Sequence, residues 1–129
     1  MAKTALDIAG DQWLAYDVGA AVRRRQASPD RQAQERWQQA QQLAREAAQR
    51  LRGEFGAQRV VLFGSAVERS LFTRWSDVDL AAWGIPPERF YAAGAAVTDL
   101  CADIPVDLVD GEQCSENLQE AIEREGVEL

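Results

Sequence analysis

An alternation of acidic and apolar residues restricts what this chain can fold into. The segment Asp77-Val78-Asp79-Leu80 places two aspartates two residues apart, with apolar side chains between and after them. In an extended strand, side chains at i and i+2 point to the same face. The two carboxylates therefore stand side by side, while Val78 and Leu80 face a core. Carboxylates this close repel each other unless a cation lies between them, and Mg2+ prefers such oxygen ligands. The pattern predicts a metal site on a strand.

A Gly-Ser pair upstream predicts a phosphate-binding turn. The β-branched and aromatic run Arg59–Phe63 predicts a short buried strand that ends at Gly64. Glycine lets the backbone approach a ligand closely, and Ser65 adds a hydroxyl beside backbone N–H groups. A strand, a turn and a helix start in this order are typical of sites that hold phosphate groups. Together with the metal pair, they predict binding of a metal-bound nucleoside triphosphate.

A third aspartate lies within a later apolar run. Asp107 stands between Val106 and Leu108 in the segment Ile104–Asp110, which predicts another strand with one inward carboxylate. Asp110, at the end of that run, is expected to be a turn residue. Three carboxylates on neighbouring strands suit a two-metal centre, in which one ion activates a hydroxyl and the other holds the triphosphate.

These motifs resemble those of the DNA polymerase β nucleotidyltransferase superfamily. More narrowly, the chain is similar over residues 40–129 to the minimal nucleotidyltransferase (MNT) proteins, small domains often paired with HEPN-domain partners. The positions that carry the motif are Gly64, Ser65, Ser76, Asp77, Asp79 and Asp107. The resemblance implies that the three aspartates are catalytic and bind two Mg2+ ions. It also implies that the two serines and the glycine bind ATP, the nucleotide donor.

One segment departs from the family pattern. Many relatives carry an Arg-Gly pair shortly after the Gly-Ser turn, where this chain has Glu68-Arg69. Either the arginine is displaced by one position and Arg69 contacts the nucleotide, or that contact is lost. Glu68 also adds a negative charge near the expected triphosphate site, which favours a slower enzyme but leaves all three carboxylates in place.

The resemblance implies a Mg-dependent nucleotidyltransferase that moves AMP from ATP to a hydroxyl of a partner protein. It implies that the partner is a HEPN ribonuclease toxin in a hetero-oligomer, that the acceptor is a tyrosine and that the chain is an antitoxin. Two alternatives stay open. One is a catalytically weak binding module that neutralises its partner by contact. The other is transfer to a small aminoglycoside-like molecule, which requires a pocket completed by dimerisation.

Composition excludes several other functions. The formal net charge of −7 argues against direct nucleic-acid binding, which needs a cationic surface. The chain has neither a long apolar run nor a secretory signal, so we expect a cytoplasmic protein without a membrane span. The absence of histidine excludes Ser-His-Asp and Cys-His mechanisms. Cys101 and Cys114 have no zinc-site spacing and are expected to be reduced packing residues.

The remaining patterns predict an α/β (α+β) fold, with a small mixed β-sheet covered by helices. By resemblance this is the polymerase β-like nucleotidyltransferase fold, here with an extra N-terminal helical segment. We expect one helix over residues 10–26, closed by an arginine run, and a second from an N-cap at Ser28 to Gly53. The apolar stripe of the second helix comprises Trp37, Ala40, Ala44, Ala47, Leu51 and Phe55.

Within a single domain, we place the N-terminal helical segment at residues 1–53 and the nucleotidyltransferase core at residues 54–129. The first segment either packs on the core or extends from it as a partner surface. In the core, further helices are expected to begin near Pro87 and Ser115, and residues 127–129 to form a short final strand.

Overall fold

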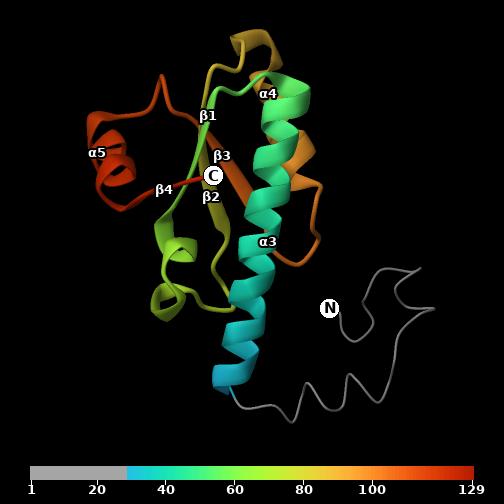
Figure 1. Ribbon diagram of the computed structural model, residues 1–129, viewed down its shortest axis with the longest axis vertical. Coiled ribbons are helices and arrows are strands. Elements are labelled where there is room, and N and C mark those ends of the chain that lie inside the picture. Colours follow the sequence, from blue (N-terminus) through green and yellow to red (C-terminus); the bar gives the residue numbers. More distant parts are fainter. Residues whose placement is uncertain (1–28) are drawn as a thin grey trace, which may run out of the picture. The chain divides into compact units, whose positions relative to one another are not determined.

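The computed structural model describes residues 29–129 (Figure 1). The helix expected over residues 10–26, the arginine run at its end and the N-cap at Ser28 lie outside the described residues. The described elements are α3 (Pro29–Phe55), β1 (Arg59–Phe63), the 3-10 turns η1 (Gly64–Val67) and η2 (Arg69–Leu71), β2 (Val78–Trp83), α4 (Pro87–Thr98), β3 (Val106–Asp110), α5 (Glu116–Glu125) and β4 (Val127–Glu128).

The strands form one mixed sheet in the order β3-β2-β1-β4. Strand β1 runs antiparallel to both β2 and β4, whereas β2 and β3 are parallel. Helix α4 makes the crossover that two parallel neighbours require. The expected fold class, a small mixed sheet covered by helices, is therefore confirmed.

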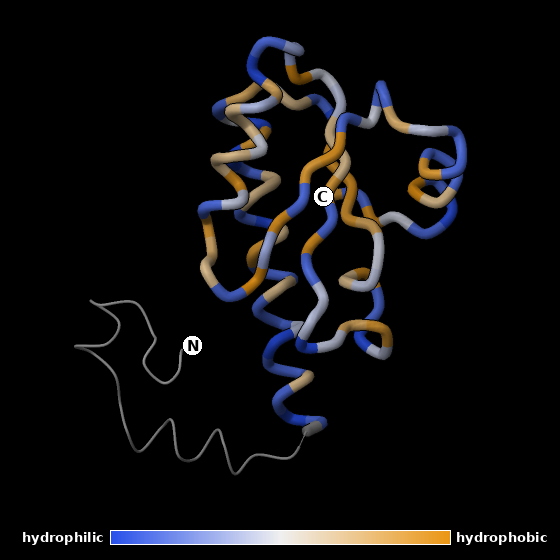
Figure 2. The backbone as a smooth tube through the Cα atoms, turned by 180° about the vertical axis from the view of Figure 1, so that it is seen from behind, coloured by the Kyte–Doolittle hydropathy of each residue, from blue (hydrophilic) through white to orange (hydrophobic). Residues whose placement is uncertain are grey.

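Alternation along the strands divides the apolar residues between the two faces of the sheet. On one face Leu62, Leu80 and Val106 join the main core, to which α3 and α4 contribute. On the other face Val61 and Ala81 pack with Ile122 of α5. Figure 1 shows α3 and α4 on one side of the sheet and α5 on the other, and Figure 2 shows the apolar strands at the centre of the domain. Asp79 lies between Leu80 and Val78 in sequence and so faces the α5 side.

Helix α3 buries the predicted apolar stripe but ends later than expected. Leu51 and Phe55 are both buried in the main core, so apolar packing continues past the exposed Gly53. The helix ends at Gly56, which adopts a positive φ of 78°, and Ala57 N–H then donates to the Leu51 carbonyl at 3.0 Å. The expected boundary between residues 53 and 54 therefore falls inside one continuous helix.

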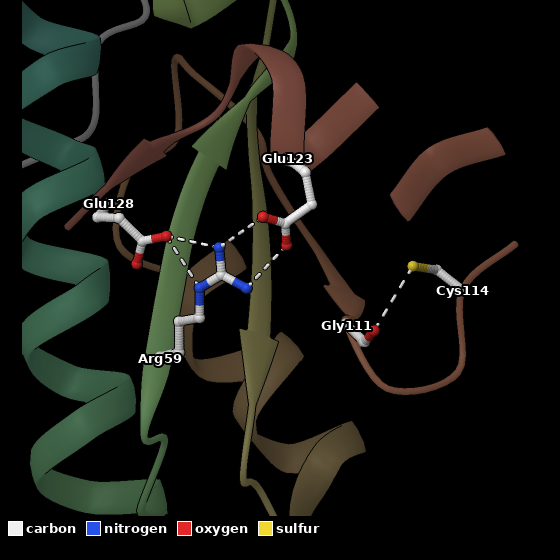
Figure 3. Close-up of polar contacts among 5 residues, drawn as sticks. All are labelled: Arg59, Gly111, Cys114, Glu123 and Glu128. Carbon is white, nitrogen blue, oxygen red and sulfur yellow. Dashed lines mark hydrogen bonds and ion pairs between the residues drawn. The ribbon is translucent and has the colours of Figure 1, made fainter. Parts of the chain in front are cut away.

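The C-terminal elements are attached to β1 through Arg59. Its guanidinium donates to Glu128 of β4 at 2.6 Å and to Glu123 of α5 at 3.0 Å (Figure 3). The guanidinium also lies 4.3 Å from the centre of the Trp83 ring. The hydrogen bond from Arg59 lowers the pKa of Glu128. The short strand expected at residues 127–129 thus forms and is held at the sheet edge.

Both cysteines are free thiols, as expected. The Cys114 thiol donates to the Gly111 carbonyl at 3.7 Å (Figure 3). Cys101 packs against the main core, and Cys114 against the smaller apolar cluster on the α5 side. Within residues 29–129, no helix combines the length and the apolar character that a membrane span requires.

Candidate metal and nucleotide site

The sheet topology brings the three predicted aspartates together. Asp77 immediately precedes β2, Asp79 is the second residue of β2 and Asp107 is the second residue of β3. Because β2 and β3 are parallel, both strands begin at the same end of the sheet, and Asp79 pairs directly with Asp107. One carboxylate oxygen from each aspartate lies within 4.8 Å of the others. Asp77 and Asp79 are half-buried, and Asp107 is exposed to solvent.

Electrostatic repulsion within this group is strong. Burial, together with the smaller effects of the neighbouring charges of Asp77 and Asp107, raises the pKa of Asp79 to about 6. Burial also raises the pKa of Asp107, with smaller contributions from a side-chain hydrogen bond to Asp77 and from the Asp77 charge. A divalent cation among these oxygens would offset the repulsion and favour the ionised forms. Three hard oxygen donors at this separation fit Mg2+, which binds through a few carboxylates together with substrate phosphates.

The Gly-Ser turn lies beside the carboxylates. Strand β1 is antiparallel to β2, so its last residue, Phe63, pairs with Asp79, and Gly64 follows at the same end of the sheet. Gly64 has a φ of 80°, and a Cβ atom built there would lie 2.5 Å from Asp79 Oδ2. Only glycine therefore allows this backbone to lie against the Asp79 carboxylate.

The segment after Gly64 differs from the expected helix start. Residues Gly64–Val67 form a single 3-10 turn, in which Glu68 N–H donates to the Ser65 carbonyl at 3.4 Å. Glu68 is then extended, with φ −128° and ψ 126°, because the chain turns again into η2. A phosphate at this turn would meet the backbone of one 3-10 turn and the half-buried Ser65, not the N-terminus of an α-helix.

Ser76 shapes the loop that leads into Asp77. Its hydroxyl accepts a hydrogen bond from Thr73 N–H at 2.9 Å and lies 3.2 Å from the Thr73 hydroxyl. Its own N–H donates to the Thr73 carbonyl at 3.1 Å. Ser76, which was predicted to bind the nucleotide, therefore lies in a turn just before Asp77. Its hydroxyl is already hydrogen-bonded to Thr73.

In the Glu68-Arg69 segment, Glu68 connects the two 3-10 turns and Arg69 begins η2. Arg69 is half-buried, and the exposed Glu68 carboxylate accepts a hydrogen bond from the Ser70 hydroxyl at 2.9 Å. A nucleotide contact from Arg69 stays a prediction. Downstream, Phe72 is buried in the main core, whereas Trp75 is 80 % exposed, with the Arg74 guanidinium 4.8 Å from its ring centre.

Sequence reasoning did not single out the polar residues of α3 that contact the site loops. Arg36 and Gln41 occur in a segment rich in Gln and Arg, and Trp37 was assigned only to the apolar stripe. All three donate side-chain hydrogen bonds to loop carbonyls at the carboxylate end of the sheet. The local sequence carries no signal for these contacts, because they depend on which loops lie beside the helix.

The described residues form an α+β domain with a group of three carboxylates at one end of its sheet. No protein-family model matches the sequence, and no curated protein matches it either. Solved structures do resemble it. A toxin–antitoxin MntA–HepT structure is 22 % identical, with a TM-score of 0.51 over 68 % of this chain and 69 % of that chain. A tyrosine-to-alanine mutant of such a complex is 25 % identical, with a TM-score of 0.54 over 66 % of this chain and 69 % of that chain.

A third similar structure is a toxin–antitoxin with AMP-PNP. It is 23 % identical to this chain and has a TM-score of 0.53, covering 64 % of this chain and 69 % of its own. These likenesses show that the chain has a fold found in toxin–antitoxin structures, two of which contain MntA. The expected resemblance to the minimal nucleotidyltransferases is confirmed at the level of the fold.

Proposed function

We propose that this chain is a Mg2+-dependent nucleotidyltransferase that transfers AMP from ATP to a tyrosine hydroxyl of a HEPN ribonuclease toxin and thereby acts as its antitoxin. The observation that carries the proposal is the group of three carboxylates within 4.8 Å, next to a glycine turn that no other residue type could form without displacing Asp79. A triphosphate and its metal ions need these two features at one site.

In this proposal Asp77, Asp79 and Asp107 hold the metal ions. Bound Mg2+ would neutralise the triphosphate and lower the pKa of the acceptor hydroxyl. The exposed Asp107 accepts the proton of that hydroxyl. The hydroxyl oxygen then forms a bond to the α-phosphorus, the bond from that phosphorus to the pyrophosphate oxygen breaks, and pyrophosphate leaves.

The remaining predicted residues position the nucleotide. Gly64 and Ser65 hold the terminal phosphates through the backbone and hydroxyl of the turn, and Arg69 adds a positive charge nearby. Ser76 contributes by fixing the loop into Asp77, through its hydrogen bonds with Thr73. Catalysis of this type depends mainly on positioning and charge neutralisation, so we expect the loss of one carboxylate to be severe.

The assignment of the partner rests on the similar solved structures. Two of them are toxin–antitoxin structures that contain MntA, and a third is a toxin–antitoxin with AMP-PNP. The described residues form an α+β unit in which the three carboxylates lie at one end of the sheet and Asp107 is exposed to solvent. A protein partner that brings its own hydroxyl to this end would complete the site.

The test is intact-mass measurement of the partner toxin after incubation with this chain, ATP and Mg2+. We expect a gain of one or more AMP units with the wild type and none with the Asp77→Asn, Asp79→Asn double variant. Asp110→Asn is the matched control, because Asp110 accepts a hydrogen bond from Glu112 N–H at 2.9 Å that an asparagine oxygen can retain.

Two results would contradict the proposal. If the double variant modifies the toxin at the wild-type rate, the carboxylates are not the catalytic group. If neither protein modifies the toxin but both neutralise it in a stable complex, the chain is an antitoxin that acts by contact alone.

A further inference from the structure

One face of α3 contacts each of the three loops that carry the predicted site residues. Arg36 makes the widest set of contacts. Its guanidinium donates to the Thr73 carbonyl at 3.4 Å, the Ser76 carbonyl at 3.3 Å and the Asp103 carbonyl at 3.4 Å. The first two carbonyls belong to the loop that enters β2 at Asp77, and the third belongs to the loop that leads to β3 and Asp107.

Two neighbours of Arg36 hold the third loop. Trp37 Nε1 and Gln41 Nε2 both donate to the Ala66 carbonyl, at 3.0 and 2.7 Å. Ala66 lies in η1, the turn that begins at Gly64, and is itself fully buried. The glycine turn, the loop into β2 and the loop into β3 are therefore all bonded to a stretch of α3 less than two turns long.

These contacts come from the face of the sheet opposite to the Asp79 carboxylate. Helix α3 packs on the sheet face that Val78 and Leu80 share, whereas Asp79 points to the opposite face. The acceptors of Arg36 are backbone carbonyls, so its charge is bonded to the loops and not to the acidic group. A planar guanidinium can bond several acceptors in a fixed geometry, which a lysine ammonium on a flexible stem cannot. The guanidinium also lies 5.8 Å from the centre of the Phe72 ring, at the start of the same loop.

We infer that Arg36 is a positioning residue that sets the distance between Asp77 and Asp107 by bonding the backbone of both loops. Trp37 and Gln41 set the position of the glycine turn in the same way. The N-terminal half of α3 is thus part of the active-site architecture and not only a surface for a partner. The effect on transfer rests on the proposed function, whereas the effect on the loops does not.

The loops can be tested without any assumption about activity, by amide hydrogen exchange on the full chain. In Arg36→Ala we expect exchange on the order of tenfold faster at the N–H groups of Ser76 and Val78, the scale of losing hydrogen bonds to a charged group. These amides donate to Thr73 and Pro105, in the two loops that Arg36 connects. Exchange in residues 60–62 of β1 should not change.

A second variant makes the test specific for each loop. In Trp37→Phe with Gln41→Ala, the Ala66 carbonyl loses both donors, so faster exchange is expected in residues 64–68 and not at Ser76. Arg45→Ala is the matched control for the loss of an arginine from α3. Arg45 is exposed, and its guanidinium donates to the Gln42 side chain of the same helix at 3.1 Å. We expect it to leave all three loops unchanged.

Activity then tests the positioning role itself. In Arg36→Ala we expect kcat for transfer to fall by about 100-fold, with a much smaller change in the KM for ATP, because misplaced carboxylates affect the reacting geometry most. Arg36→Lys should recover only part of kcat. Arg45→Ala should keep both constants at the wild-type value.

The outcomes separate the two proposals. Unchanged exchange at Ser76 and Val78 in Arg36→Ala, or an equal increase throughout β1, overturns the positioning role. A wild-type chain that does not modify the toxin overturns the proposed function, while faster exchange confined to the two loops would still support the architecture. Equal losses of kcat in Arg36→Ala and Arg45→Ala would also refute the positioning role.

Discussion

Replacing Asp79 by asparagine should stabilise the metal-free protein while removing its response to Mg2+. The pKa of Asp79 is raised from 3.8 to about 6 by burial and by the charges of Asp77 and Asp107. Each pKa unit corresponds to about 1.4 kcal/mol, so the complete shift sets an upper bound of about 3 kcal/mol. Asp79 is only half-buried, and solvent screening reduces the expected destabilisation to about 1 kcal/mol.

The pH dependence follows from the direction of the shift. The folded-state pKa of Asp79 lies above the unfolded value, so the folded protein binds the extra proton between about pH 4 and pH 6. The destabilisation is therefore absent below that window, grows as the pH rises through it and is complete above it. Asp79→Asn removes the charge, so its gain in stability should be present at pH 7.5 and absent at pH 3.5.

Thermal unfolding followed by circular dichroism measures both effects. With EDTA at pH 7.5, we expect Asp79→Asn to unfold about 5 °C above the wild type, the shift that about 1 kcal/mol causes in a domain of this size. With Mg2+ at about 100 times its Kd, the wild type should gain about 2.7 kcal/mol and the variant far less. Asp110→Asn serves as the control and should change neither value.

Three results would refute this reasoning. One is a metal-free Asp79→Asn protein that is no more stable than the wild type at pH 7.5. Another is a stability gain of the same size at pH 3.5, which would show that the repulsion of ionised carboxylates is not its cause. The third is equal stabilisation of both proteins by Mg2+.

Three further predictions concern the backbone and the core. Gly64→Ala should lower the free energy of unfolding by about 1–3 kcal/mol and abolish stabilisation by Mg2+, because φ is 80° and the new Cβ meets Asp79 Oδ2; unchanged Mg2+ stabilisation would contradict the role of this turn. Gly53→Ala, in an open helical position, should raise that free energy by about 0.5–1 kcal/mol in chemical denaturation, and a decrease would show that the helix does not continue through it. Leu51→Ala should lower the free energy of unfolding by about 2–5 kcal/mol, and helix and sheet signals should report the same single unfolding transition. Two separate transitions would instead favour an independent segment at residues 1–53.

Much of the local structure could be read from periodicity. Alternation in Asp77-Val78-Asp79-Leu80 predicted which side chains are buried, and the structure confirms that Val78 and Leu80 are in the core. The spacing of apolar residues in α3 likewise predicted its buried stripe. The predicted end of this helix was wrong because two glycines lie close together in the sequence. Gly53 was assigned as the stop, but only Gly56 adopts a positive φ, and the burial of Phe55 decides between them.

The sequence by itself determined the residue types of the site and the side of each strand on which they stand, because side-chain direction repeats every two residues and needs no knowledge of distant contacts. Only the tertiary structure decided that Asp79 pairs with Asp107 and that Gly64 lies against Asp79, since strand order and register depend on how the whole sheet packs. The contacts of Arg36 with Ser76 and Asp103 were likewise decided only by the tertiary structure. They join residues far apart in the chain, and nothing in the sequence near Arg36 distinguishes it from the exposed arginines of the same helix.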